Sequence, residues 1–95
     1  MEKNTEAAVH LIVHGRVQGV GFRDFTRSTA QDLGIVGWVK NRWDGTVEIR
    51  AEGPKEKLER LVNTVRRGPS LAWVERVEEE WDTATKQFTS FKVNY

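Results

Sequence analysis

The residues from 14 to 23 read H-G-R-V-Q-G-V-G-F-R and have the composition of an oxyanion-binding loop. Glycine reaches backbone conformations that let successive N–H groups converge on one concavity. A helical pattern begins at Phe22, so the concavity would lie at a helix N-terminus, where the dipole favours an anion. Arg23, in the first helical turn, offers a planar fork of donors for two phosphate oxygens. We therefore expect the backbone of Gln18, Gly19, Val20, Gly21 and Phe22, with the Arg23 side chain, to bind a phosphoryl group.

This loop matches neither common nucleotide-binding motif. A P-loop ends in G-K-[ST], whereas this stretch ends in G-F-R. A dinucleotide fold needs a long parallel βαβ unit and a second half, for which 95 residues leave no room. Glycines also mark turns and close packing, so the loop by itself leaves open whether it binds a ligand.

Other polar side chains in this region suit structural roles. His10 and His14 are four residues apart, about 13 Å along a strand, which is too far to share one metal ion. We expect both to be exposed or half-buried strand residues. Asp24 in the first helical turn is explained by the helix dipole. Mid-helix hydroxyls without a partnered base are poor nucleophiles, and this applies to Thr26, Ser28 and Thr29.

Apolar periodicity predicts the elements that must position this loop, in the order strand, helix, strand, strand, helix, strand, strand. Gly34 ends the first helix, Gly68-Pro69 ends the second, and Asp44-Gly45 marks a hairpin turn. The predicted strands are 9–14, 35–41, 47–52, 72–81 with a bulge between Val74 and Val77, and 91–95; the predicted helices are 22–33 and 54–67.

With right-handed crossovers, this order predicts an α+β fold, the ferredoxin-like βαββαβ sandwich, with a mostly antiparallel sheet and both helices on one face. We expect a single domain at 9–95 after a flexible tail at 1–8. The first helix should place Phe22, Phe25, Thr29 and Leu33, flanked by Thr26 and Ala30, on one side. The second helix should bury Leu58, Leu61, Val62 and Val65, and the third strand should leave Glu48, Arg50 and Glu52 on its solvent-exposed face. Many unrelated functions share this fold.

The composition is that of an ordinary globular chain, with 38% hydrophobic and 31% charged residues. The absence of cysteine removes disulfides, thiolate metal sites and a cysteine nucleophile. No stretch approaches the roughly 20 apolar residues of a membrane span, and the start lacks an apolar signal region, so we expect a cytoplasmic protein without a membrane partner. The net charge of +1 does not indicate nucleic acid, but residues 10–42 carry five basic and two acidic side chains, which would attract a small anion.

Two gapped motifs resemble the signatures of the acylphosphatase family. Residues 13–23, V-H-G-R-V-Q-G-V-G-F-R, are similar to the first signature, and residues 37–53, G-W-V-K-N-R-W-D-G-T-V-E-I-R-A-E-G, to the second. Together they cover a little over a quarter of the chain, in the family's order. The resemblance implies the ferredoxin-like fold, Arg23 as the phosphate-binding arginine and Asn41 as the water-orienting asparagine. Trp43 stands where the second signature is free, and it has no assigned role.

These residue types suit the hydrolysis of an acyl phosphate. The loop and Arg23 would hold the phosphoryl oxygens, and the amide of Asn41 would hold a water in line with phosphorus. A carboxylate, with a pKa of about 4, leaves without a general acid. The sequence offers no nucleophile in the loop and no carboxylate cluster for magnesium. We expect a metal-independent enzyme without cofactor, acting as a monomer on a small acyl phosphate, with inorganic phosphate as product and competitive inhibitor.

Two other functions stay open at this point. A non-catalytic module with the same loop would sense a phosphorylated metabolite without turning it over. An RNA-recognition domain shares the element order, but the third strand, T-V-E-I-R-A-E, lacks the aromatic run of such domains, so we expect no nucleic-acid partner. Asn41 could instead bond its own turn, and Arg23 could pair with Asp24, Asp32 or the terminal carboxylate.

Overall fold

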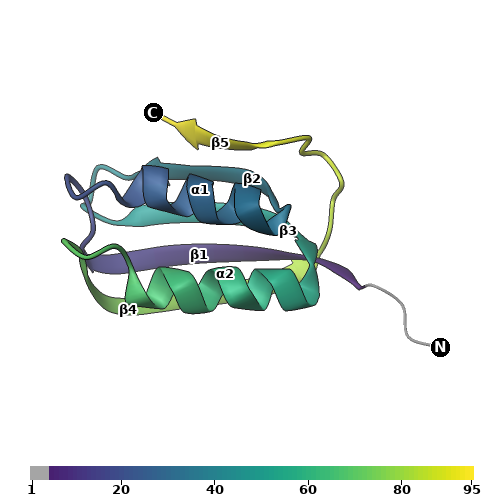
Figure 1. The fold of residues 1–95 in the computed structure, drawn as a ribbon, viewed down its shortest axis with the longest axis horizontal. Helices are drawn as coiled ribbons and strands as arrows, with labels where there is room; N and C mark the ends of the chain where they lie inside the picture. The colour runs from purple at the N-terminus through teal and green to yellow at the C-terminus, as the bar shows by residue number, and fades with distance from the viewer. Residues whose placement is uncertain (1–4) are drawn as a thin grey trace.

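The computed structural model describes residues 5–95, which contain the seven expected elements in the expected order (Figure 1). Within this range they form two layers, a five-stranded sheet and two helices that cover one of its faces. The elements are β1 (Glu6–Arg16), α1 (Phe22–Leu33), β2 (Val36–Asn41), β3 (Val47–Pro54), α2 (Lys55–Arg67), β4 (Trp73–Thr83) and β5 (Phe91–Asn94).

The strand order across the sheet is β4-β1-β3-β2-β5. β1 pairs antiparallel with β3 and β4, and β2 pairs antiparallel with β3. β5 runs parallel to β2, with Val93 opposite Val39 and Asn94 opposite Lys40. This confirms the ferredoxin-like α+β fold, a mostly antiparallel sheet with both helices on one face.

The core lies between the sheet and the two helices. α1 packs against β2 and β5, while α2 packs against β1, β3 and β4. α2 buries the four residues that its periodicity predicts, Leu58, Leu61, Val62 and Val65. None of the helices within residues 5–95 is long and apolar enough to cross a membrane.

The buried stripe of α1 lies on the predicted side of the helix, shifted toward the flanking residues Thr26 and Ala30. It consists of Phe22, Thr26 and Ala30, spaced four residues apart, while Phe25 and Leu33 are only half-buried at its border. The buried hydroxyl of Thr26 donates a 2.9 Å hydrogen bond to the carbonyl oxygen of Phe22. Threonine can therefore replace an apolar residue here, because its polar atom is satisfied within the helix.

The first strand begins earlier than its apolar pattern indicates. β1 starts at Glu6, which pairs with Pro54, and Ala7 and Ala8 are buried. The prediction of a flexible tail is therefore wrong for residues 6–8, because β3 extends to Pro54 and supplies a pairing partner for them. Thr5 precedes β1, and its carbonyl oxygen accepts a 2.8 Å hydrogen bond from the N–H of Lys55. Residues 1–4 of the predicted tail lie outside the described residues.

The predicted bulge in the fourth strand is confirmed. His14 pairs with Arg76 and Gly15 pairs with Val74, so Glu75 is the extra residue of β4. Gly15 has φ of +130°, and a Cβ at this position would collide with the carbonyl oxygen of Trp73. The close approach of the two backbones at the bulge thus requires glycine.

Glu52 is buried, not on the wet face of β3 as its alternation predicts. β4 and β5 lie at opposite edges of the sheet, so the segment between them must cross the end of β3. There, the N–H and hydroxyl of Thr85 and the N–H of Lys86 donate to the Glu52 carboxylate at 2.7 to 3.1 Å. Burial would raise the pKa of Glu52, but these hydrogen bonds outweigh it and hold the pKa below the usual value.

Candidate active site

The predicted site residues meet at one end of the molecule. The β1–α1 loop, the β2–β3 turn, the α2–β4 loop and the end of β5 all lie there (Figure 1). A pocket of about 120 Å³ opens at this end. It is lined by the loop before α1, the first turn of α1, Asn41 at the end of β2, and Val93 and Tyr95 at the end of the chain.

We call residues 18–22 the glycine loop. Gly19 and Gly21 have φ of 74° and 79°, left-handed conformations that other residues rarely adopt. Gly21 is the N-cap of α1, and no side chain caps the helix there. Within residues 5–95, none of the five N–H groups of the glycine loop donates to another backbone group. The loop thus presents free donors at the positive end of the helix dipole.

Arg23 lies in the first turn of α1 and lines the pocket. Its guanidinium carbon is 4.8 Å from the centroid of the Tyr95 ring. In the described part of the chain Arg23 forms no ion pair, and Asp24 instead pairs with Arg27 at 3.0 Å. The structural alternatives for Arg23 are therefore not realised, and its donors are available to an anion in the pocket.

Asn41 is the last residue of β2, and its side chain lines the same pocket. Its Oδ1 is buried and, among the described residues, has no hydrogen-bond partner. A buried oxygen without a partner costs about 1–3 kcal/mol. Asn41 does not bond its own turn, which is closed by the N–H of Arg42 donating to the Thr46 carbonyl at 2.8 Å. Asn41 thus lines the pocket without being held by its own turn.

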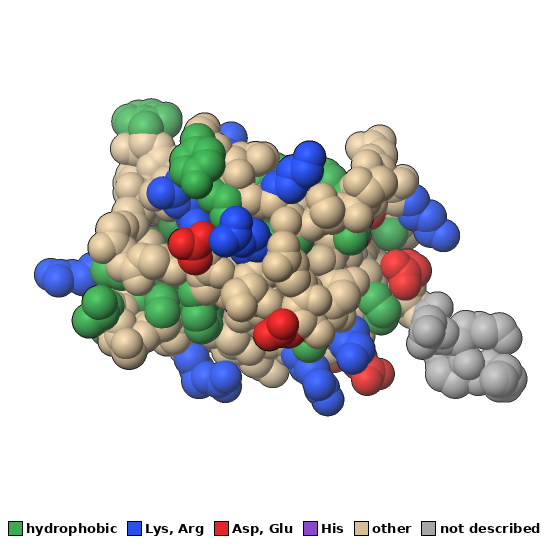
Figure 2. Space-filling model, turned by 45° about the horizontal axis from the view of Figure 1, so that its top comes forward, with side chains coloured by type: hydrophobic (Ala, Val, Ile, Leu, Met, Phe, Trp, Pro, Cys, Tyr) green, Lys and Arg blue, Asp and Glu red, His purple; other side chains and the backbone are tan. Residues whose placement is uncertain are grey.

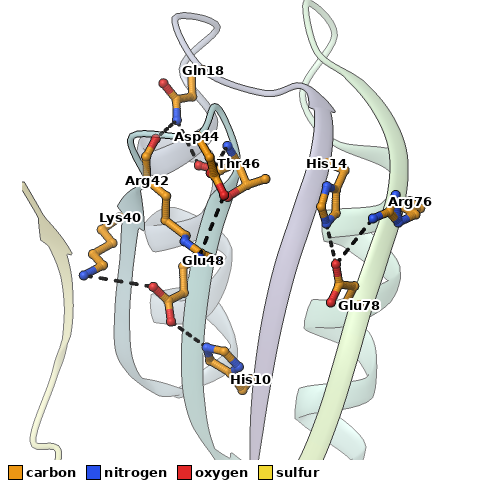
Figure 3. A network of polar contacts seen from close by, with 10 residues as sticks. All are labelled: His10, His14, Gln18, Lys40, Arg42, Asp44, Thr46, Glu48, Arg76 and Glu78. Carbon is orange, nitrogen blue, oxygen red and sulfur yellow. Dashed lines mark hydrogen bonds and ion pairs between the residues drawn. The ribbon is translucent and has the colours of Figure 1, made fainter.

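The side chain of Gln18 joins the glycine loop to the β2–β3 turn. Its Nε2 donates to the carbonyl oxygens of Arg42 and Thr46 at 2.7 and 2.9 Å (Figure 3). Sequence reasoning assigned Gln18 only a backbone role and missed this clamp. The sequence signal that could have indicated this contact was a side-chain amide with two N–H donors in a loop, together with a predicted hairpin turn. The clamp holds the loop beside the strand end that carries Asn41.

The β2–β3 turn is itself braced, which confirms the predicted Asp44-Gly45 hairpin. Oδ1 of Asp44 accepts hydrogen bonds from the hydroxyl and the N–H of Thr46 at 2.6 and 3.0 Å. The Thr46 hydroxyl, and then its N–H, hold the pKa of Asp44 below the usual value. Trp43 lies at the tip of this turn and is 98% exposed. The turn therefore keeps a defined shape next to the pocket.

The two histidines lie away from the pocket, on the sheet face that the helices leave open. His10 Nε2 is 2.6 Å from a carboxylate oxygen of Glu48, and His14 Nε2 is 2.6 Å from one of Glu78 (Figure 3). The hydrogen bond from His14 lowers the pKa of Glu78. Both histidines are half-buried, as expected. In the described part of the chain, no three side chains of metal-binding type gather into a cluster.

The family model that matches this chain is that of acylphosphatase, over residues 9–93. The chain belongs to the acylphosphatase family. It is 48% identical over 93 residues to an acylphosphatase of Salinibacter ruber, covering 98% of both chains. It is 45% identical over 91 residues to an acylphosphatase of Pelotomaculum thermopropionicum, covering 96% of this chain and 99% of that one. The crystal structure of acylphosphatase from Bacillus subtilis matches with a TM-score of 0.91 and 39% identity, covering 94% of this chain and 99% of the other.

As a member of the acylphosphatase family, the chain is an enzyme that hydrolyses the carboxyl–phosphate bond of acyl phosphates. The non-catalytic sensing module is thereby set aside. Of the residues predicted for the acylphosphatase site, Arg23, Asn41 and three of the glycine loop line the pocket, namely Gly19, Gly21 and Phe22. The side chains of Gln18 and Val20 turn elsewhere, to the hairpin turn and to the core.

Proposed function

We propose that Arg23, the glycine loop and Asn41 form the catalytic centre, and that water attacks phosphorus directly. The observation that carries this proposal is the buried, unbonded Oδ1 of Asn41 in the described structure, in the same pocket as the free guanidinium of Arg23. An anion-binding side chain and a neutral amide side chain thus belong to residues that line one small cavity. Phosphoryl transfer by positioning and charge stabilisation needs little else from a protein.

The phosphoryl group binds to Arg23 and to the N–H groups of the glycine loop. Charge spreads over the three non-bridging oxygens in the transition state, and preformed donors stabilise it without reorganising. The guanidinium fork holds two oxygens at once, and the helix dipole adds to its effect. This part of the site binds inorganic phosphate as well, so phosphate is a competitive inhibitor.

Asn41 orients the attacking water. Its Oδ1 accepts a hydrogen bond from the water, which leaves a water lone pair directed at phosphorus. The water oxygen forms a bond to phosphorus while the bond to the carboxyl oxygen breaks, and the electron pair leaves with the carboxylate. The two protons of the water stay with the product, dihydrogen phosphate. A carboxylate departs unprotonated, so the scheme requires no general acid.

The assay is hydrolysis of benzoyl phosphate in excess EDTA, corrected for the spontaneous rate. We expect Arg23→Ala to lower kcat/KM by roughly 1,000-fold or more and to raise the Ki of inorganic phosphate, because it removes the charge that meets the phosphoryl oxygens. Asn41→Ala lowers kcat by roughly 100-fold or more and leaves the phosphate Ki within about threefold, because it removes only the water contact.

Matched controls of the same residue types are available elsewhere in the chain. Arg27→Ala removes a half-buried arginine one turn further along α1, and Asn63→Ala removes an exposed asparagine on α2. Both keep wild-type turnover. Full activity of Asn41→Ala would refute its role with water, and an unchanged phosphate Ki in Arg23→Ala would refute the assigned phosphate site. A monomeric state and a cytoplasmic location belong to the same proposal, and sedimentation and cell fractionation test them.

A further inference from the structure

We propose that Tyr95 contacts the acyl part of the substrate and makes the enzyme selective for acyl phosphates with an aromatic acyl group. This inference rests on the proposed function and extends it to the half of the substrate that the glycine loop does not hold. The lining of the pocket includes Asn41 at the end of β2, Val93 of β5 and Tyr95 directly after β5.

The strand register places Tyr95 next to Asn41. β2 and β5 are parallel, with Val93 opposite Val39 and Asn94 opposite Lys40. Asn41 and Tyr95 follow directly at the two strand ends. Since side chains alternate along a strand, both lie on the face of the buried Val39, the one covered by α1. The ring of Tyr95 reaches from there to Arg23, 4.8 Å from its guanidinium carbon.

Asn41 and Tyr95 differ in their exposure to solvent. Oδ1 of Asn41 is buried, whereas Tyr95 is 98% exposed. We therefore place the attacking water on the Asn41 side of the pocket, away from the exposed Tyr95. In-line displacement requires the leaving group to point away from that water, toward the Tyr95 side. The acyl group thus emerges at the rim where the Tyr95 ring lies over Arg23.

The rim is apolar as well as basic. The large apolar side chains that are most exposed among residues 5–95 are Trp43, Leu71, Trp73 and Tyr95, and all lie on loops or strand ends at this end of the molecule. Figure 2 shows apolar side chains exposed there, at the left of the view, with Lys and Arg among them. Tyr95 is the member of this set that lines the pocket in the described structure. An aromatic acyl group can stack on its open ring, which the methyl group of acetyl phosphate cannot do.

The test compares kcat/KM for benzoyl phosphate and acetyl phosphate, together with the Ki of inorganic phosphate. In Tyr95→Ala we expect the benzoyl-to-acetyl ratio of kcat/KM to fall roughly three- to tenfold, the size of one lost stacking contact. Tyr95→Phe keeps the ring and holds the ratio within about twofold of wild type. Trp43→Ala is the matched control, because it removes an equally exposed aromatic ring that does not line the pocket, and it keeps the wild-type ratio.

Two results would overturn the proposal. An unchanged ratio in Tyr95→Ala would show that the ring does not contact the acyl group. A proportional loss on both substrates with a weaker phosphate Ki would show that Tyr95 acts only through Arg23. Failure of the proposed catalytic centre is seen separately, in the turnover of acetyl phosphate by Arg23→Ala and Asn41→Ala.

Discussion

Replacing the buried glutamate at the far end of the sheet should destabilise the domain in a pH-dependent way. The Glu52 carboxylate accepts from two N–H groups and one hydroxyl of the segment that links β4 to β5. In Glu52→Gln one carboxylate oxygen becomes an NH₂ group that faces these donors, so at least one buried donor loses its acceptor. Hydrogen bonds to a charged group are worth about 1.5–3 kcal/mol each, and an orphaned donor costs about 1–3 kcal/mol. We expect a loss of about 3 kcal/mol at pH 7, a fall of roughly 12–24 °C in Tm for a domain of this size.

The pH dependence follows from the depressed pKa of Glu52. A carboxylate whose pKa is lower in the folded state stabilises the fold above its unfolded pKa and loses this contribution as pH falls through its folded pKa. The ordinary value is 4.5, so the difference between wild type and Glu52→Gln is constant from neutral pH to about 5 and narrows at lower pH. Urea unfolding of both proteins between pH 7 and pH 2.5 measures this difference.

The comparison with wild type isolates Glu52 from the other carboxylates of lowered pKa, Asp44, Glu78 and Glu79, which both proteins share. Glu80→Gln, at an exposed position on β4, serves as the control and should change the free energy of unfolding by less than about 0.5 kcal/mol. A loss below about 1 kcal/mol in Glu52→Gln, or a difference from wild type that persists in full at pH 2.5, would refute the reasoning.

Two further predictions concern the glycine loop. Gln18→Ala removes the hydrogen bonds to the carbonyls of Arg42 and Thr46, so it should cost about 1–3 kcal/mol in urea unfolding and lower kcat because Asn41 loses its register with the loop. Gln18→Glu keeps a side chain of similar shape but lacks the two N–H donors, so it should be no more stable or active than Gln18→Ala. Wild-type kcat in both variants would contradict the clamp. Gly21→Ala should cost about 1–2 kcal/mol because the residue is left-handed, and Gly21→Asn should cost less. Equal Tm values for these two variants would argue against backbone strain.

The ends of a helix could be predicted from the sequence where residues next to it in the chain stop it. α1 is predicted and found from Phe22 to Leu33, because left-handed glycines at Gly21 and Gly34 flank it. α2 begins one residue later than predicted, at Lys55, because Pro54 still pairs with Glu6 as the last residue of β3. The periodicity of α2 also predicts its buried face correctly, since one stripe of apolar residues meets one sheet.

Contacts between distant segments could not be read from local pattern. Glu52 follows the polar alternation of an exposed strand, and it is buried only because the chain must cross from one sheet edge to the other. The clamp by Gln18 depends on where a hairpin 24 residues further along the chain comes to lie. In both cases the fold topology decides which residue becomes the hydrogen-bond partner. A short stretch of sequence does not show that topology.

The residues of the proposed catalytic centre divide in the same way. The sequence by itself determined the types and the motifs: a glycine-rich loop at a helix N-terminus, an arginine in the first turn, an asparagine before a hairpin, and the family to which they belong. Only the tertiary structure decided that Arg23 and Asn41 line one pocket, that Asn41 Oδ1 is buried without a partner in the described chain, and that Tyr95 stands at the rim. The physical reason is that local preferences form helices and strands, whereas burial and hydrogen-bond partners arise only when α1 packs on β2 and β5.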